Sequence, residues 1–243
     1  MVEQQVANLS FAQICRSGQC FRMREYRKGV FEVIAGNRRL EVSQDGEWCR
    51  FDCEQEEFDN FWRDYFDLDT DYSQYLERIN PRDIYLVQAA EAGWGIRILQ
   101  QDLWEMIATF LISQQNNITR IRRCVENICE KYGQRCEECN LGYRSKYVVR
   151  TAKMIASGEF DLEAVKHMSY SKAKPCLMTL FGVGEKVADC ICLFSLHQLQ
   201  SFPVDTHIRQ ALDAHYKRGF PNRRYRGIQG VMQQYIFYYE LGK

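Results

Sequence analysis

Proline and long apolar runs are both scarce in this chain of 243 residues. No run of about 18 apolar residues occurs, which excludes a membrane-spanning helix and gives no reason to expect a membrane partner. The start, Met1-Val-Glu-Gln-Gln, lacks the basic residues and the apolar stretch of a signal peptide, so we expect a cytoplasmic protein. Only four prolines are present, each near an expected helix start or connection, so long helical segments stay uninterrupted. An apolar content of 46% excludes a disordered chain.

The chain also lacks net charge, because 32 basic side chains balance 32 acidic ones. Neutrality argues against a nucleic-acid partner, whose phosphates attract lysine and arginine. The charge is unevenly distributed, however. Residues 1–100 carry 12 basic and 18 acidic groups (net −6), and residues 101–243 carry 20 and 14 (net +6). The second half is therefore the candidate for nucleic-acid binding, and we expect the acid after residue 52 to face away from the partner. The first half adds one basic cluster, made of Arg22, Arg24, Arg27 and Lys28.

Cysteine is abundant, but a disulfide framework is not expected, because the count of eleven is odd and no export signal is present. Cys129, Cys136 and Cys139 stand as C-x6-C-x2-C. That spacing resembles three of the four ligands of the iron–sulfur cluster in endonuclease III-like proteins. The fourth position holds Ser145, and the alternative is a four-thiolate site completed by Cys124. We expect reduced thiols and no bound metal.

Hydrophobic periodicity divides the chain into two parts. Residues 29–35 and 39–43 alternate apolar and polar side chains as half-buried strands do, with turn residues at Gly36-Asn37 and Asp45-Gly46. The acidic, aromatic stretch 52–75 is expected to be loop and short helix facing solvent. Helical spacing then predicts helices at about residues 144–157, 171–180, 185–197, 206–217 and 225–240. We therefore predict an α+β fold, with an N-terminal antiparallel sheet domain (1–82) followed by an orthogonal helical domain (83–243).

Residues 171–196 predict two helices joined by a tight turn. Gly182 and Gly184 allow a sharp turn with unobstructed amides. The second helix begins at once, so its free N–H groups and positive dipole end suit a phosphate. An ordinary helical hairpin with glycine as a stop signal is the alternative interpretation.

Lys186 lies in the first turn of that second helix, where the helix dipole disfavours a cation. The same field, together with burial, lowers a lysine pKa and favours an amine nucleophile. Asp189, three residues later, could instead pair with Lys186 and leave it an inert cation. Asp205 precedes an apolar-periodic helix and is expected to cap it. A capping carboxylate is kept ionised, so it is also available to stabilise positive charge on a reacting sugar.

Five separated blocks of the chain together resemble the 8-oxoguanine branch of the helix-hairpin-helix DNA glycosylases. They comprise residues 17–22, 114–120, 141–147, 182–207 and 230–237. The resemblance extends over nearly the whole chain and includes the hairpin glycines, Lys186 and the Val204-Asp205-Thr206-His207 segment. It implies base-excision repair by a bifunctional DNA glycosylase and AP lyase that flips 8-oxoguanine out of duplex DNA. The partner implied is double-stranded DNA containing an oxidised purine, bound by a nucleoid-associated monomer.

The resemblance also assigns roles to residues. Lys186 would attack C1′ and form a Schiff base, and Asp205 would stabilise the oxocarbenium-like sugar before β-elimination on the 3′ side. The residues implied to recognise the flipped base are Gly18, in an early strand motif, with Cys190, Gln233 and Phe237. The residues implied to contact DNA are Gln115, Asn117, Arg120, Tyr143 (the wedge), Arg144, Gly182, Gly184 and His207. No cofactor is required, although the backbone carbonyls of Met178, Leu180 and Val183 could hold a monovalent cation.

The chain departs from the family pattern at two positions. Gln115 stands where the family commonly has the first of three asparagines, which puts strict recognition of the opposite cytosine in doubt. Met23 replaces a tryptophan. Two rival hypotheses remain: an alkylpurine or adenine glycosylase, which would lack a lysine at position 186, and a non-catalytic DNA-binding module that uses the hairpin only for phosphate.

Overall fold

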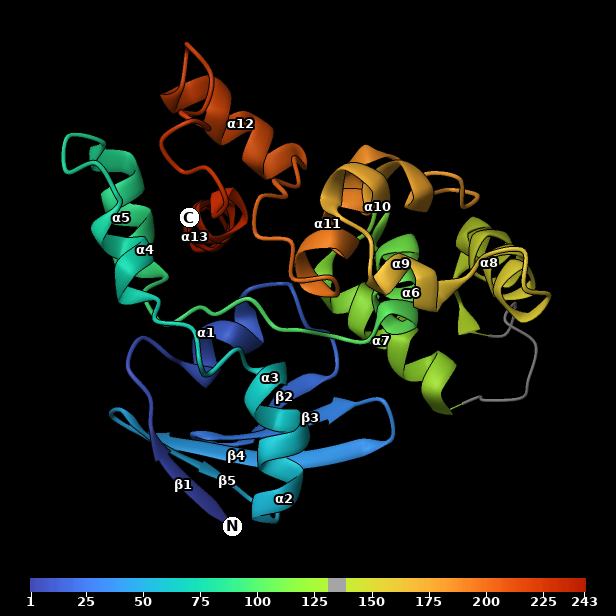
Figure 1. Ribbon diagram of the computed structural model, residues 1–243, viewed down its shortest axis with the longest axis horizontal. Helices are drawn as coiled ribbons and strands as arrows, with labels where there is room; N and C mark the ends of the chain where they lie inside the picture. The colour runs from blue at the N-terminus through green and yellow to red at the C-terminus, as the bar shows by residue number, and fades with distance from the viewer. Residues whose placement is uncertain (131–138) are drawn as a thin grey trace.

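A computed structural model, which describes residues 1–130 and 139–243, contains an antiparallel sheet beside a larger helical array (Figure 1). The sheet has five strands in the order β1-β5-β4-β3-β2. The strands are β1 (Val2–Gln5), β2 (Met23–Arg27), β3 (Val30–Ala35), β4 (Arg38–Asp45) and β5 (Trp48–Phe51). Gly36 and Gly46 adopt positive φ angles of 58° and 60° in the turns between these strands, as the turn residues predicted. The predicted α+β fold class is confirmed.

One face of the sheet is apolar and covered by helices. Phe11 of α1 (Phe11–Arg16) contacts Phe51, with ring centroids 5.8 Å apart. Phe58 contacts the same ring at 4.8 Å. Phe58 belongs to a continuous helical segment made of α2 (Gln55–Glu57), the π-helical turn η1 (Phe58–Trp62) and α3 (Arg63–Tyr65).

The expectation that residues 52–75 face solvent is therefore wrong for the aromatic side chains of this stretch. Phe58, Trp62, Phe66 and Tyr72 are buried. Acidic residues alternate with rings in the sequence, but the helical twist gathers Phe58, Trp62 and Phe66 on the side that packs on the sheet. Tyr72 packs in the core of the helical part instead.

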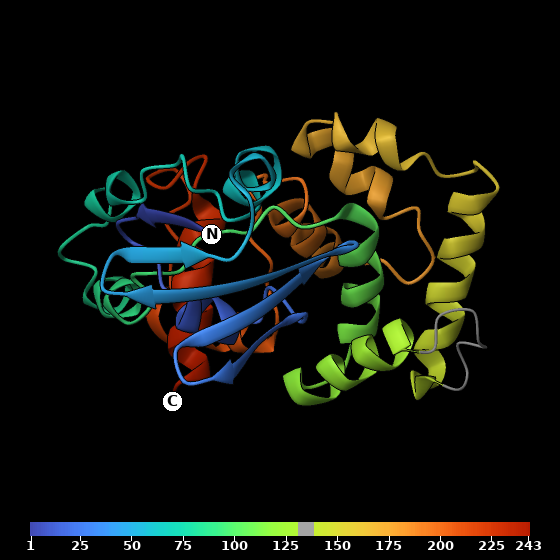
Figure 2. The same cartoon turned by 90° about the horizontal axis from the view of Figure 1, so that it is seen from below.

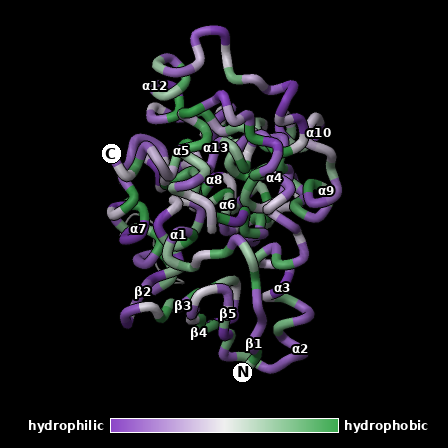
Figure 3. Tube along the Cα trace, turned by 90° about the vertical axis from the view of Figure 1, so that its left-hand side faces the viewer, coloured by the Kyte–Doolittle hydropathy of each residue, from purple (hydrophilic) through white to green (hydrophobic). Residues whose placement is uncertain are grey.

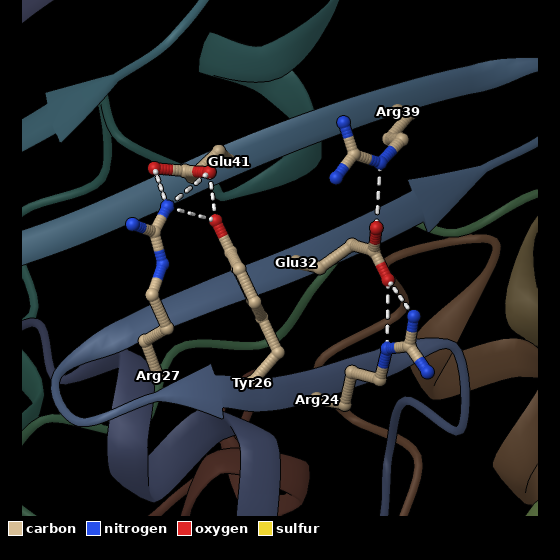
Figure 4. Close-up of polar contacts among 6 residues, drawn as sticks. All are labelled: Arg24, Tyr26, Arg27, Glu32, Arg39 and Glu41. Atoms are coloured by element: carbon tan, nitrogen blue, oxygen red, sulfur yellow. Dashed lines mark hydrogen bonds and ion pairs between the residues drawn. The ribbon is translucent and has the colours of Figure 1, made fainter.

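The opposite face of the sheet carries ion pairs (Figure 4). Arg24 lies opposite Glu32 in the β2–β3 register, and the Glu32 carboxylate accepts from Arg24 at 2.7 Å and from Arg39 at 2.5 Å. Glu41 similarly accepts from Arg27 and Tyr26. The predicted basic cluster is thus largely neutralised, because carboxylates on neighbouring strands form ion pairs with its arginines.

Arg22 of that cluster is also paired, with Glu105 at 3.2 Å. Arg22, Arg24 and Arg27 of this cluster therefore each have a carboxylate partner within the protein.

The helical part is built around α13 (Gln229–Leu241), which packs against α5 (Ile84–Ala92) and α12 (Thr206–His215). In Figure 2 α13 crosses behind the strands, and in Figure 3 hydrophobic stretches gather in the middle of the helical part. The remaining helices are α4 (Ser73–Glu77), α6 (Leu103–Ser113), α7 (Ile118–Glu130), η3 (Gly142–Arg144), α8 (Ser145–Ala156), α9 (Leu162–Lys166), α10 (Tyr170–Leu177) and α11 (Glu185–Phe194).

All five helices predicted between residues 144 and 240 are present, and α9 is an additional helix between the first two of them. The last one starts later than predicted, since residues 222–227 form turns before Gln229. No helix in the described ranges is long and apolar enough to cross a membrane.

Arg97 ties the two parts together. Its buried guanidinium donates to the carbonyls of Ala7, Asn8 and Asp67. Each hydrophobic core also contains a residue from the other part of the chain. Leu99 packs with the sheet, and Phe21 packs with the helices. The domain boundary at 82/83 stays a prediction.

Candidate active site

The residues expected to act on the flipped base meet at one place in the fold. A cavity of about 790 Å³ is lined by Gly18, Lys186, Asp205 and Phe237. It adjoins a recess of about 40 Å³ that these four residues share with Cys190 and Gln233. Segments that are far apart in the sequence therefore meet at one cavity, from residue 18 to residue 237. We call this cavity the reactive cavity.

The hairpin between α10 and α11 has the local geometry that its glycines predicted. Gly182 has a φ of +91°, and a Cβ there would meet the Tyr147 ring at 2.8 Å, so both its backbone angle and the close packing of Tyr147 require glycine. Gly184 is the N-cap of α11 and supplies no side chain to the first amides of that helix. These N–H groups remain available to an anion.

Lys186 points into the reactive cavity from the first turn of α11. Its Nζ lies 5.3 Å from the centroid of the Phe110 ring. Asp189 does not pair with it, because the Asp189 carboxylate accepts from Lys174 at 2.9 Å and from the Tyr170 hydroxyl at 2.7 Å. The alternative in which Asp189 makes Lys186 an inert cation is therefore not what the structure shows.

Asp205 is the N-cap of α12, as predicted. Its Oδ1 accepts from the Ile208 amide at 2.8 Å. The carboxylate is half-buried and lines both the reactive cavity and its recess together with Lys186. The hydrogen bond from the helix amide fixes the orientation of this carboxylate, which can stabilise a cation in the cavity.

A buried network around Asp189 supports the segment that leads to Asp205. The Ser201 hydroxyl contacts both the backbone carbonyl of Asp189, at 2.9 Å, and its carboxylate, at 3.1 Å. Together with Tyr170 and Lys174, these contacts fix the 195–205 segment against α10 and α11. Sequence reasoning missed this network. The signal that could have found it was the four-residue spacing of Tyr170 and Lys174 on one face of a helix.

The recess is closed by side chains that are already in contact. A Cβ on Gly18 would lie 3.0 Å from the Phe237 ring, so Phe237 packs directly over this glycine. The Gln233 amide is buried and donates to the Pro203 carbonyl at 3.1 Å. Burial raises the pKa of the Cys190 thiol to about 11, although Lys186 opposes the shift, so Cys190 is a neutral thiol at neutral pH.

Gly18 does not lie in a strand. It has a φ of +72° in the loop between α1 and β2, so the expected strand motif is wrong about its local structure although the residue lines the cavity. The positive φ of Gly18 explains why no strand forms at this residue, because the chain must turn here to pass beneath Phe237.

The turn between α6 and α7 carries Gln115 and Asn117, which line the reactive cavity. Gln115 is exposed and has a φ of +47°, an uncommon angle for a residue with a side chain. Asn117 accepts from the Arg120 amide at 2.9 Å and so caps α7, while the Arg120 side chain is exposed. His207, at the start of α12, also lines the cavity and lies near Phe237.

Tyr143 and Arg144 differ in exposure. Tyr143 is 43% exposed, whereas Arg144 is only 4% exposed. The Arg144 guanidinium donates to the carbonyls of Gln114, at 2.8 and 2.5 Å, and of Gln115, at 2.8 Å. In this structure Arg144 holds the α6–α7 turn and does not project toward a partner base. Its role in reading a base stays a prediction, which now requires these contacts to open.

The metal and cation predictions remain open. Cys136 lies outside the described residues, and in the part of the chain that the structure covers no cluster of three metal-ligating side chains is present. Cys124 and Cys139 instead contact backbone carbonyls through their thiols. A monovalent cation on the hairpin carbonyls stays a prediction.

Comparisons with known proteins agree with this arrangement. Residues 1–107 match the family model described as 8-oxoguanine DNA glycosylase, N-terminal domain. A probable N-glycosylase/DNA lyase of Methanothermobacter thermautotrophicus is 31% identical over 226 residues, covering 71% of this chain and 71% of that protein. The N-glycosylase/DNA lyase of Saccharomyces cerevisiae is 28% identical over 190 residues, covering 63% of this chain and 50% of the yeast protein. The match thus spans about half the length of the yeast relative.

A solved structure of the Clostridium acetobutylicum 8-oxoguanine glycosylase/lyase, in complex with double-stranded DNA containing cytosine opposite 8-oxoguanine, has a TM-score of 0.91 at 32% identity. The match covers 99% of this chain and 97% of that one. The chain therefore belongs to the helix-hairpin-helix 8-oxoguanine DNA glycosylase family, whose members include N-glycosylase/DNA lyases.

Proposed function

We propose that this protein is a bifunctional DNA glycosylase and AP lyase that excises 8-oxoguanine opposite cytosine from duplex DNA. The observation that carries the proposal is the convergence of Lys186 and Asp205 on one recess, beside the residues expected to enclose the base. Lys186 supplies an amine without a carboxylate partner among the described residues, and Asp205 supplies a carboxylate held by a helix amide. One chain carries all of these groups, so we propose that it acts as a monomer.

The chemistry follows from these two groups. The neutral amine of Lys186 donates its lone pair to C1′ of the deoxyribose while the C1′–N9 bond breaks. The electrons of that bond leave with the base, which then takes up a proton. The Asp205 carboxylate stabilises the positive charge that develops on the sugar. The nitrogen then loses a proton, and its lone pair forms the C=N bond as the C1′–O4′ bond breaks and O4′ takes up a proton, which leaves a Schiff base on Lys186. Loss of a C2′ proton then expels the 3′ phosphate and cleaves the strand.

Base entry requires a side chain to move. The recess of about 40 Å³ has room for about one water molecule, whereas a purine is several times larger. Phe237 is the side chain that closes it over Gly18. We infer that Phe237 shifts when the base is extruded and then packs against the base, opposite Cys190.

Partner-base recognition is proposed for the α6–α7 turn and the residues around it. Arg120 is exposed and can donate to a base edge, and Tyr143 can occupy the space left by the flipped nucleotide. Gln115 in place of an asparagine moves the amide one methylene further from the backbone. We therefore propose weaker discrimination for cytosine than in proteins with three consecutive asparagines here.

The decisive experiment is borohydride trapping on duplex DNA that contains 8-oxoguanine opposite cytosine. Borohydride reduces a Schiff base to a stable covalent adduct, which the native protein should form and Lys186→Gln should not. Lys172→Gln is the matched control, because Lys172 is an exposed lysine on α10 of the same hairpin. An adduct that survives in Lys186→Gln would contradict the proposed nucleophile.

Asp205→Asn tests the second group. Asparagine also caps helices, so the fold and DNA binding should persist while single-turnover base release falls by about 100-fold or more. Equal base release would mean that the carboxylate only caps α12. Tight DNA binding by the native protein, without adduct or base release on any damaged purine, would instead favour the non-catalytic DNA-binding module.

A further inference from the structure

One surface next to the hairpin contributes only Tyr143 to the function proposed above. It consists of Lys146, Arg150 and Lys153 on α8, with Tyr143 and Phe181 at its edges, and is called the α8 face here. These residues line a groove of about 690 Å³. All five side chains are exposed. The sequence from residue 139 to residue 157 contains no aspartate or glutamate, so no acidic residue of this segment offsets the cations.

Within the described residues, the cations of the α8 face are not neutralised by other parts of the fold either. Over residues 1–130 and 139–243, the salt bridges involve none of Lys146, Arg150 and Lys153. Arg150 and Lys146 contact aromatic rings instead, with Arg150 lying 4.4 Å from the Phe181 centroid and Lys146 lying 5.5 Å from that of Tyr147. Aromatic contacts fix the position of a cation without removing its charge.

The α8 face is held rigidly against the hairpin. The Tyr147 ring fills the space next to Gly182, where a Cβ would be only 2.8 Å away. Phe181, in the hairpin turn, contacts Tyr147 edge to face at 5.2 Å and supports Arg150. These contacts therefore fix α8 and the Arg150 guanidinium in position relative to the hairpin turn.

The groove also lies next to the reactive cavity, because a residue that lines the one contacts a residue that lines the other. Tyr143 lines the groove, and its hydroxyl donates to the Gln115 side chain at 3.4 Å. Gln114 and Gln115 line the reactive cavity, and the Gln114 amide donates to the Gly182 carbonyl at 3.0 Å. Hydrogen bonds therefore connect Tyr143 in the groove, through Gln115, to the lining of the reactive cavity.

We propose that the α8 face binds the sugar–phosphate backbone of the duplex next to the lesion, so that the DNA footprint extends beyond the hairpin. This inference rests on the proposed function, because that function supplies the duplex. Exposed, unpaired lysine and arginine side chains release counterions from phosphates. The exposed ring of Phe181 offers an apolar surface to a deoxyribose beside them. An acidic protein surface would also satisfy the charge, but it has no reason to lie next to the reactive cavity.

The test is the salt dependence of binding to a duplex that carries a tetrahydrofuran abasic-site analogue, which the enzyme cannot cleave. In Lys146→Gln/Arg150→Gln/Lys153→Gln, the slope of log affinity against log salt concentration should fall by about 0.9 for each phosphate that is no longer neutralised, or roughly 2–3 in all. Single-turnover release of 8-oxoguanine at saturating enzyme should change less than about twofold, because the reactive cavity is untouched.

The matched control neutralises three exposed cations at the opposite side of the molecule: Arg82→Gln/Lys217→Gln/Arg218→Gln. Arg82 precedes α5, and α5 and α8 lie at opposite edges of the view in Figure 1. The control should keep the native slope. A native slope in the α8 variant, or an equal decrease in both triple variants, would overturn the inference.

A second arm uses duplexes shortened on either side of the abasic analogue. The difference between native protein and the α8 variant should disappear when the arm that reaches α8 is removed. A difference that persists with both short duplexes would overturn the inference and would favour a nonspecific effect of charge. Failure of the proposed function is seen separately, as absence of a borohydride adduct with the native protein.

Discussion

Cations on the sheet and cations on α8 are placed in opposite electrostatic settings. On the sheet, Arg24 and Arg39 share the Glu32 carboxylate, and Arg27 pairs with Glu41 (Figure 4). On α8, Lys146 and Arg150 contact rings and have no carboxylate partner in the described parts of the chain. A neutral protein therefore combines a sheet that neutralises its own cations with a helical surface whose cations are available to a partner.

The difference shows why counting charges along the sequence is insufficient. A cation already paired with a carboxylate gains less from a phosphate, since the existing ion pair must be broken. The sheet half of the chain has a basic cluster in its sequence. The strand register, however, places carboxylates beside most of the arginines of that cluster. Pairing thus decides which basic residues can bind DNA.

The largest effect is expected where an ion pair supports the reactive cavity. Asp189→Ala removes the acceptor of Tyr170, Lys174 and Ser201 at a side chain that is only 9% exposed. Because Lys174 is partly exposed, we expect a decrease of about 2–3 kcal/mol in the free energy of unfolding, measured by urea denaturation. Base release at saturation should fall about tenfold or more, because the segment leading to Asp205 is no longer held in place.

Asp189→Asn is the control for this variant. Its amide oxygen still accepts from Tyr170 and Ser201, so base release should recover most of the way although the ion pair with Lys174 is not restored. Native base release by folded Asp189→Ala would show that the network stabilises the fold without positioning Asp205. In that case the ion pair near the reactive cavity would contribute to stability alone, as the ion pairs on the sheet do.

A smaller effect is expected from Glu32→Gln on the sheet. Glu32 is 8% exposed but both of its arginine partners are 64% exposed, so solvent screens the pairs and the free energy of unfolding should fall by only about 1 kcal/mol. The variant leaves Arg24 and Arg39 unpaired. If the ionic face of the sheet does not contact DNA, the salt slope of binding should stay native. A steeper slope would show that the pairing had kept these arginines from DNA.

The pH dependence of this contribution has a defined sign. Arg39 and Arg24 lower the pKa of Glu32 from its ordinary value of 4.5, so the native state binds fewer protons there than the unfolded state. The stability from this carboxylate is fully present above pH 4.5 and is lost as the pH falls through the lowered value. The stability difference between native protein and Glu32→Gln should therefore shrink only in acid, as urea denaturation at a series of pH values would show.

Local chemistry was the part of the site that could be predicted. Gly182, Gly184 and Lys186 are close in sequence, and Asp205 directly precedes a helix, so turn and capping preferences placed them correctly. The fold class was also predictable, because a period of two gives way to a period of 3.6 along the chain.

Contacts between distant segments could not be predicted from the same patterns. Arg144 follows an exposed tyrosine in sequence, yet its guanidinium is buried on the carbonyls of a turn about 30 residues away. The acidic residues after residue 52 suggested a segment that faces solvent. Phe58 and Trp62, which lie among those acidic residues, are nevertheless buried and cover the sheet. In both cases the partner that decides burial comes from another element, which a local pattern does not contain.

The smallest effect should come from removing one exposed cation that is already paired. Arg27 is 65% exposed in its contact with Glu41, so Arg27→Gln should change the free energy of unfolding by less than about 0.5 kcal/mol. Its salt slope for DNA binding should remain native. Lys146→Gln is the matched variant on α8. It removes the same single charge from an exposed side chain with no carboxylate partner in the described ranges, and it should lower the slope by about 0.9. Anisotropy titrations at several salt concentrations would measure both. Equal slopes in the two variants would mean that pairing with a carboxylate does not decide which cations bind DNA, and the contrast between the sheet and α8 would then have no functional meaning.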